Sequence, residues 1–206
     1  MADYMVKRKL KAVTKDINFG YEFSHFLNFP QQLASRWEDH QTIGNCLCHI
    51  LAAPVQGAAG LALIHLYAGY YTALVCSLIL SAWCIANDRK YGTIYSVYSI
   101  STTLLQLTFL SQIDLDTLLC TIALTVFIQL GIGHGLFERR LPNETEGIHK
   151  GDGKLFAAVD IANEVILATF HFYSLAMVRL GYRPDIYPEV RQELNRIQNL
   201  LADQDP

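Results

Sequence analysis

The sequence predicts an all-α integral membrane protein, a bundle of about four transmembrane helices with a fifth apolar helix that carries a polar stripe. Hydrophobic residues make up 51% of the 206 residues and charged residues only 17%, below the roughly 25% of an average soluble domain. Several apolar stretches approach the roughly 20 residues that a helix needs to cross hydrocarbon. The alternation expected of membrane strands is absent from the sequence, and a bilayer accepts only helices or closed barrels.

Four stretches are predicted to cross the bilayer as helices, namely residues 44–66, 69–86, 91–110 and 115–137. They contain no Lys, Arg, Asp or Glu apart from Asp116 near the start of the fourth. A charge inside hydrocarbon is costly, so this composition favours spans. The third stretch is the most polar, with a first half rich in Ser, Thr and Tyr. The connections are short, and neighbouring spans are therefore expected to form antiparallel hairpins.

The basic residues predict how the spans are oriented. All sixteen Lys and Arg residues lie before the first span, in the turn at 88–90, or after Glu138. Because Lys and Arg accumulate in cytosolic loops, the N-terminus, this turn and the Arg139-Arg140 pair are expected in the cytosol. The first 40 residues show no apolar core of a cleavable signal. This fits a multi-pass protein of the endoplasmic reticulum membrane with its N-terminus in the cytosol.

A fifth apolar segment, residues 155–178, carries polar side chains along one side. At 100° per residue, Asp160, Glu164 and His171 fall within about 40° of one another on one helix face. Such a stripe must face the protein interior or water rather than lipid. A full crossing would place the arginines that follow on the wrong side for the charge rule. We therefore expect the segment to be partly embedded or re-entrant.

The C-terminal tail from residue 188 is predicted to be an amphipathic helix. Its apolar side consists of Val190, Leu194, Ile197 and Leu201. This side could lie on the membrane surface or pack on the rest of the protein, and the sequence favours neither.

Histidines at the ends of two predicted spans are the candidate functional residues. His40 and His49 flank the start of the first span, and Asn45 shares a helix face with His49, four residues away. Nine residues correspond to about 900°, so on one straight helix His40 and His49 would point in opposite directions. A shared site therefore needs His40 in the lead-in and a bend near Gly44.

His134 lies at the end of the fourth predicted span, among three glycines and four residues before Glu138. The first span enters from the cytosol and the fourth returns to it, so His49 and His134 are expected at similar depth. Imidazoles that converge with a carboxylate would suit a non-haem iron with open positions for oxygen and substrate. Each histidine alone could instead be a hydrogen-bonded interfacial residue. The pattern distinguishes neither iron from zinc nor a metal from acid–base chemistry.

Three motifs in the chain resemble one enzyme family. Residues 129–142, with Gly-Ile-Gly-His-Gly-Leu-Phe-Glu-Arg-Arg at their centre, resemble the signature of the iron(II)-dependent 2-hydroxy fatty acid dioxygenases of the endoplasmic reticulum, which act in the α-oxidation branch of phytosphingosine breakdown. Residues 179–182, Arg-Leu-Gly-Tyr, are similar to a basic-Leu-Gly-aromatic turn of that family. An earlier motif is similar as well, and consists of His40, Asn45, His49 and Pro54. The similarity extends over about residues 40–184.

The resemblance implies a small helical membrane enzyme that uses Fe(II) and O2 to shorten a 2-hydroxy fatty acid, or a similar lipophilic acid, by one carbon. The implied metal ligands are His40, His49 and His134. Glu138 would be a further ligand or would orient His134. Asn45 and Glu138 are thus the candidate catalytic residues.

Five more residues are candidates for supporting roles. Arg139 and Arg140 could hold the carboxylate of an acidic lipid substrate, or serve only as topology anchors. Asp160, Glu164 and His171 could support the metal ligands, although hydrogen bonding within the bundle is an alternative use of all three.

The predicted division of the chain is a polar N-terminal extension, residues 1–39, a membrane-embedded catalytic domain, residues 40–184, and the amphipathic tail, residues 185–206. The expected partners are a lipophilic small molecule, O2 and membrane lipid. The net charge of −3 and the lack of a basic face argue against nucleic acid.

Two other functions stay open at the level of sequence. One is a metal-free isomerase or cyclase for a lipophilic metabolite, in which Glu138, Asp160 or Glu164 would act as a buried acid or base. The other is a non-catalytic membrane scaffold, whose polar residues only join helices.

Overall fold

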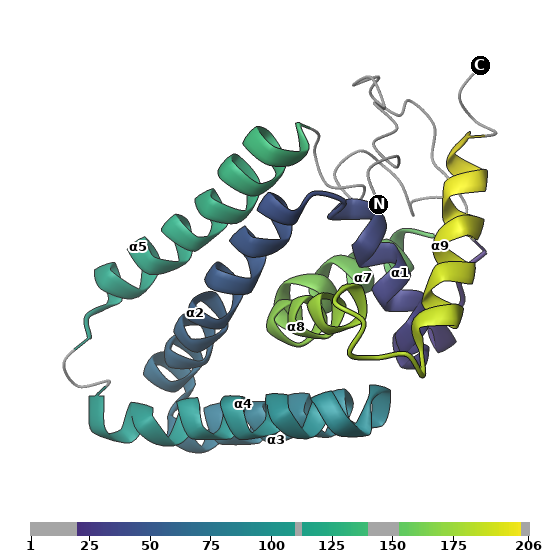
Figure 1. The fold of residues 1–206 in the computed structure, drawn as a ribbon. Coiled ribbons are helices and arrows are strands. Elements are labelled where there is room, and N and C mark those ends of the chain that lie inside the picture. Colours follow the sequence, from purple (N-terminus) through teal and green to yellow (C-terminus); the bar gives the residue numbers. More distant parts are fainter. Residues whose placement is uncertain (1–19, 110–112, 140–152, 203–206) are drawn as a thin grey trace.

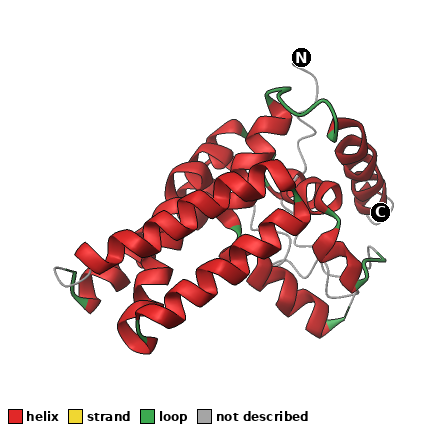
Figure 2. Cartoon of the chain, turned by 90° about the horizontal axis from the view of Figure 1, so that it is seen from below, coloured by secondary structure: helices red, strands yellow, loops and turns green. Residues whose placement is uncertain are grey.

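The computed structural model describes residues 20–109, 113–139 and 153–202, and every regular element in these ranges is a helix (Figures 1 and 2). The predicted all-α class is therefore confirmed for the described part of the chain. An apolar composition with helix-length segments and no period-2 alternation is sufficient to predict this class.

Within the described residues, three segments are long and apolar enough to cross a membrane. They are α2 (Ile43–Ala68), α3 (Tyr70–Asn87) and Leu115–Glu138. The last consists of α5 (Leu115–Val126) continued by η3 (Phe127–Glu138), a π-helix. These segments match the first, second and fourth predicted spans to within a few residues.

The third predicted span is the helix α4 (Arg89–Phe109), but this helix is not among those apolar enough to cross. The predicted count of about four spans is therefore corrected to three, or up to four with the bent pair described next. The hydroxyl side chains that lower its hydropathy serve packing, because Ser99 Oγ lies 2.6 Å from Ser77 Oγ on α3. A Cβ on Gly92 would lie 2.3 Å from the carbonyl oxygen of Cys84. Small residues thus let α3 and α4 run side by side as a tight hairpin (Figure 1).

The polar-striped fifth segment is two helices rather than one. α7 (Lys154–Ile166) and α8 (Ala168–Arg179) meet at Leu167 with a bend of 77°. This break contradicts the prediction of a single helix and fits a broken span or a re-entrant segment.

The first and last α-helices of the described chain lie against each other (Figure 1). A short 3₁₀ turn, η1 (Phe23–Leu27), leads into α1 (Phe29–Asp39), and α9 (Tyr187–Ala202) packs beside α1. The apolar side of α9 is buried, so of the two alternatives for the tail the structure shows packing on the protein. Its side chains share one hydrophobic cluster with those of α1 and α8. The packing thus joins the segment before residue 40 to the rest of the chain.

Large apolar side chains are exposed along the outer sides of the candidate spans. Examples are Leu51 on α2, 72% exposed, Ile79 on α3, 61% exposed, and Leu124 on α5, 59% exposed. Soluble monomers rarely expose large contiguous apolar patches, and such surfaces mark contact with a membrane or a partner. These faces are consistent with membrane association.

Candidate metal centre

Three buried histidines from three separate segments converge at one end of α2. His40 follows the last residue of α1, His49 lies on α2 and His134 lies on η3. Each offers one ligand atom, and these atoms all lie within 4.8 Å of one another. The three side chains are 0%, 6% and 1% exposed. This cluster could hold a metal ion, and it brings together the three histidines that the sequence singled out.

The His40 ring is directed by the backbone of α1. Its Nδ1 lies 2.8 Å from the carbonyl oxygen of Arg36, which is an acceptor, so Nδ1 carries the proton and donates it. Nε2 then keeps its lone pair and lies 3.1 Å from Nε2 of His49. The chain turns at His40 itself, with φ −126° and ψ 63°. The predicted bend near Gly44 is therefore misplaced by a few residues. Gly44 lies within α2, where a Cβ would meet the ring of Phe137 at 2.3 Å.

His134 is joined to α2 by Asn45. The amide nitrogen of Asn45 lies 3.4 Å from Nδ1 of His134, and the amide oxygen has no hydrogen-bond partner among the described residues. The two ends of an amide have nearly the same shape. Turning the amide over would let Nδ1–H of His134 donate to the oxygen and leave its Nε2 lone pair for a metal. Gly133 permits this approach, because a Cβ there would lie 2.3 Å from Oδ1 of Asn45.

Glu138 caps a helix. Its Oε1 accepts a hydrogen bond from the backbone N–H of Thr42 at 2.7 Å. The Thr42 hydroxyl in turn accepts from the backbone N–H of Asn45 at 3.2 Å. This is the reciprocal pattern of a capping box, with the acidic residue supplied by another helix. Among the described residues, Glu138 does not belong to the group whose ligand atoms converge.

The surroundings bury the site and keep His40 neutral. The Phe172 ring stacks on His49 with 4.2 Å between ring centroids and meets His40 edge-on at 4.5 Å. Burial, together with the neighbouring His49 and His134 rings, holds the pKa of His40 well below its ordinary value. The neutral form of imidazole is the one that binds a metal.

The donor set fits a divalent transition metal. The Nε2 atoms of His40 and His49 lie 3.1 Å apart, a separation that suits two adjacent ligands of one ion, since metal–nitrogen distances are about 2.1 Å. Imidazole is a common ligand of Zn, Cu, Fe and Ni, so the histidines alone do not select the ion.

The polar stripe of the fifth segment faces α1. Arg36 Nη2 lies 2.9 Å from Asp160 Oδ1, and its Nη1 lies 3.3 Å from Glu164 Oε2. His171 Nε2 lies 3.1 Å from Oε1 of Gln32. Of the two surroundings expected for this stripe, protein interior or water, the structure shows the protein interior. These contacts join the stripe to residues of α1 and not directly to the histidine cluster.

The two arginines after Glu138 are placed differently. Arg139 ends η3 with a left-handed backbone, φ 56°, and its side chain is exposed. Arg140 lies outside the described residues.

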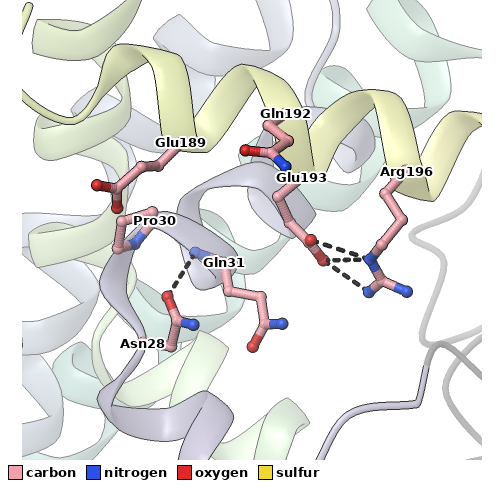
Figure 3. A pocket seen from close by; sticks show the side chains of 7 residues that line it. All are labelled: Asn28, Pro30, Gln31, Glu189, Gln192, Glu193 and Arg196. Carbon is pink, nitrogen blue, oxygen red and sulfur yellow. Dashed lines mark hydrogen bonds and ion pairs between the residues drawn. The ribbon is translucent and has the colours of Figure 1, made fainter.

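A separate pocket of about 300 Å³ lies between the start of α1 and α9 (Figure 3). It shares no residue with the histidine cluster, and Arg196 donates to Glu193 along its α9 wall at 2.6 Å. It is lined by Asn28, Pro30, Gln31, Glu189, Gln192, Glu193 and Arg196.

The sequence analysis did not identify two arginines, Arg36 and Arg179, that form hydrogen bonds with His40. Arg36 lies four residues before His40, and that spacing on a helix could have indicated the bond to its carbonyl oxygen. Arg179 was assigned only to a turn motif, yet its guanidinium bonds to the backbone of His40.

Comparison of the chain with models of protein families, with curated proteins and with solved structures returned no match.

Proposed function

We propose that this protein is a membrane-embedded Fe(II)-dependent dioxygenase that shortens a 2-hydroxy fatty acid, or a similar lipophilic acid, by one carbon. The observation that carries the proposal is the convergence of three buried histidines, His40, His49 and His134. Among the described residues no carboxylate joins their donor atoms. Three neutral ligands would leave the ion its full charge and open positions, which favours an anionic substrate group.

Fe(II) bound there would supply the activation of O2. The net reaction, RCH(OH)COOH + O2 → RCOOH + CO2 + H2O, balances in atoms and electrons without a further reductant. All electrons taken by O2 come from the C1–C2 unit of the acid.

The protein's own residues supply position and a dry environment. The backbone of Arg36 orients His40, Asn45 orients His134, and Phe172 covers one side of the site.

Exposed leucines lie nearby on the outer sides of α2 and η3, such as Leu47 and Leu136. An acyl chain would enter there from the bilayer, with its carboxylate near Arg139 at the end of η3. We propose a cytosolic N-terminus because of the distribution of basic residues, and the endoplasmic reticulum membrane because the dioxygenases that the motifs resemble lie there.

The acid–base alternative loses support from the contacts of its carboxylates. Glu138 caps α2 through Thr42, and Asp160 and Glu164 pair with Arg36. A general base needs access to the proton that it removes.

The test is turnover by the purified protein in lipid nanodiscs, supplied with Fe(II), O2 and 2-hydroxypalmitate. We expect a product one carbon shorter, detected by mass spectrometry, and no such product from His49→Ala or His134→Ala. A 3-hydroxy acid of equal length is the matched control substrate, since it lacks the adjacent hydroxyl. Equal activity in the parent and both histidine variants would refute the proposal.

A further inference from the structure

Arg179, the last residue of α8, contacts both segments that carry the first two histidines. Its Nη1 donates to the carbonyl oxygen of His40 at 2.8 Å, and its Nη2 donates to that of Gln41 at 2.9 Å. Nη1 also lies 2.9 Å from the Sγ of Cys46 on α2. One planar guanidinium thus spans two successive carbonyl groups, a geometry that a rigid fork of donors provides.

The carbonyl groups held in this way belong to the turn that aims the His40 ring. His40 lies between α1 and α2 with non-helical dihedral angles, and its carbonyl oxygen also accepts from the Cys46 thiol at 3.3 Å. The ring contacts Arg36 through Nδ1, and the backbone contacts Arg179 through its carbonyl oxygen. Together these two contacts direct Nε2 of His40 toward His49.

The same face of α8 supplies a second contact to this turn. Phe172 lies seven residues before Arg179, or about two helical turns, so both point to the same side. The Phe172 ring meets His40 and His49 while the guanidinium of Arg179 holds the backbone of His40. α8 therefore contacts the His40–Gln41 turn, although the two segments lie far apart in sequence.

We propose that Arg179 is a positioning residue for the metal centre, which holds the His40–Gln41 backbone so that the His40 ring stays directed at His49 and His134. The inference rests on the proposed function, because it concerns how the metal ligands are held. Residues that orient metal ligands typically change metal affinity by about 10–100-fold when they are removed.

Arg191 offers a matched control on α9. Its guanidinium lies 5.5 Å from the centroid of the Trp37 ring, and that of Arg179 lies 5.3 Å from the same ring. Both side chains are half-buried, but only Arg179 donates to the carbonyl oxygens of His40 and Gln41. Arg191→Gln removes an equal charge and the same type of aromatic contact without touching the turn.

The first measurement is Co(II) affinity of the detergent-purified protein, followed by the visible absorption of the bound ion. We expect Arg179→Gln to weaken binding by about 10–100-fold and Arg191→Gln to leave it near the parent value. Arg179→Lys should be intermediate, because an ammonium group does not span two carbonyls as a guanidinium does. The thermal unfolding midpoint, followed by helical circular dichroism, identifies any variant that fails to fold, and Arg179→Lys then carries the test.

The second measurement needs no metal. His40 is 0% exposed, so its modification by diethylpyrocarbonate in the metal-free protein should be slow, and mass spectrometry can follow it. Arg179→Gln should accelerate modification of His40, whereas Arg191→Gln should not. Unchanged Co(II) affinity and unchanged His40 protection in Arg179→Gln, or equal losses in both variants, would overturn the inference. If the parent binds no Co(II), the proposed function fails, while the reactivity of His40 still decides whether Arg179 holds the turn.

Discussion

The side-chain amide of Asn45 lies 3.4 Å from Nδ1 of His134 and joins α2 to η3 inside the histidine cluster. Asn45 also lies one helical turn before His49. It therefore links the ligand on its own helix to the ligand on the neighbouring one, through a buried contact that fixes how His134 is oriented.

Replacing Asn45 with alanine should weaken metal binding more than it weakens the fold. We expect Asn45→Ala to lower Co(II) affinity by about 10–100-fold, because His134 loses the group that sets its orientation. Gln106→Ala is the control, since Gln106 joins α4 to the backbone of α2 at Ala58 without contacting a histidine. Equal metal affinity in the parent and in Asn45→Ala would mean that Asn45 does not orient His134.

A methyl group at Gly133 should disturb the same contact. The new Cβ would lie 2.3 Å from Oδ1 of Asn45, so the amide must move. We expect Gly133→Ala to cost about 1–3 kcal/mol of stability and to lower metal affinity, measured by denaturant unfolding and Co(II) titration. Gly135→Ala is the control, because its Cβ would meet only the carbonyl oxygen of Leu130 at 3.5 Å. Parallel effects of the two substitutions would argue against a special role for Gly133.

The ion pair between Arg36 and Asp160 should matter for folding rather than for a proton-transfer step. Both side chains are fully buried, so Asp160→Asn leaves the guanidinium without its closest carboxylate and should cost about 3–5 kcal/mol of unfolding free energy. Glu164 lies further away at 3.3 Å and is partly exposed, so Glu164→Gln should cost less. A stable Asp160→Asn protein that binds metal but turns over no substrate would instead assign Asp160 a role in turnover.

Acid should loosen the docking of α9 through Glu193. Burial acts to raise the pKa of Glu193, but hydrogen bonds from Arg196 and Tyr21 outweigh it and hold the pKa below the ordinary value of 4.5. A lowered folded-state pKa means that Glu193 stabilises the protein above that ordinary value, and that this stability is lost as the pH falls through the folded-state pKa. Thermal unfolding between pH 7 and pH 3 should therefore show a smaller loss in Glu193→Gln than in the parent. Identical pH profiles would contradict this assignment.

Much of the fold follows from the sequence because a helix that crosses hydrocarbon must be long, apolar and free of charged side chains. The outer limits of α2 and α3 agree with the predicted spans because Asp39 and Asp88 bracket one long uncharged stretch, and Gly69 divides that stretch into two helices. The break at Leu167 carried no such signal, since neither proline nor glycine occurs between residues 154 and 180.

The site was predictable to the extent that it depends on topology. Placing His49 and His134 at matched depth required only the direction of two spans. The contact of Glu138 was not predictable in this way. Its spacing from His134 suggested a shared helix face, whereas its carboxylate accepts a hydrogen bond from Thr42 at the start of α2. The role of Arg179 depends on the packing of α8, which no local pattern encodes.

The most direct test of the central claim is the metal content of the detergent-purified protein, prepared anaerobically with Fe(II) supplied. The account predicts about one iron per chain in the parent, held by three imidazoles, and its loss in both His49→Ala and His134→Ala. A well-folded parent without bound metal, or variants that retain the parent's iron, would contradict it.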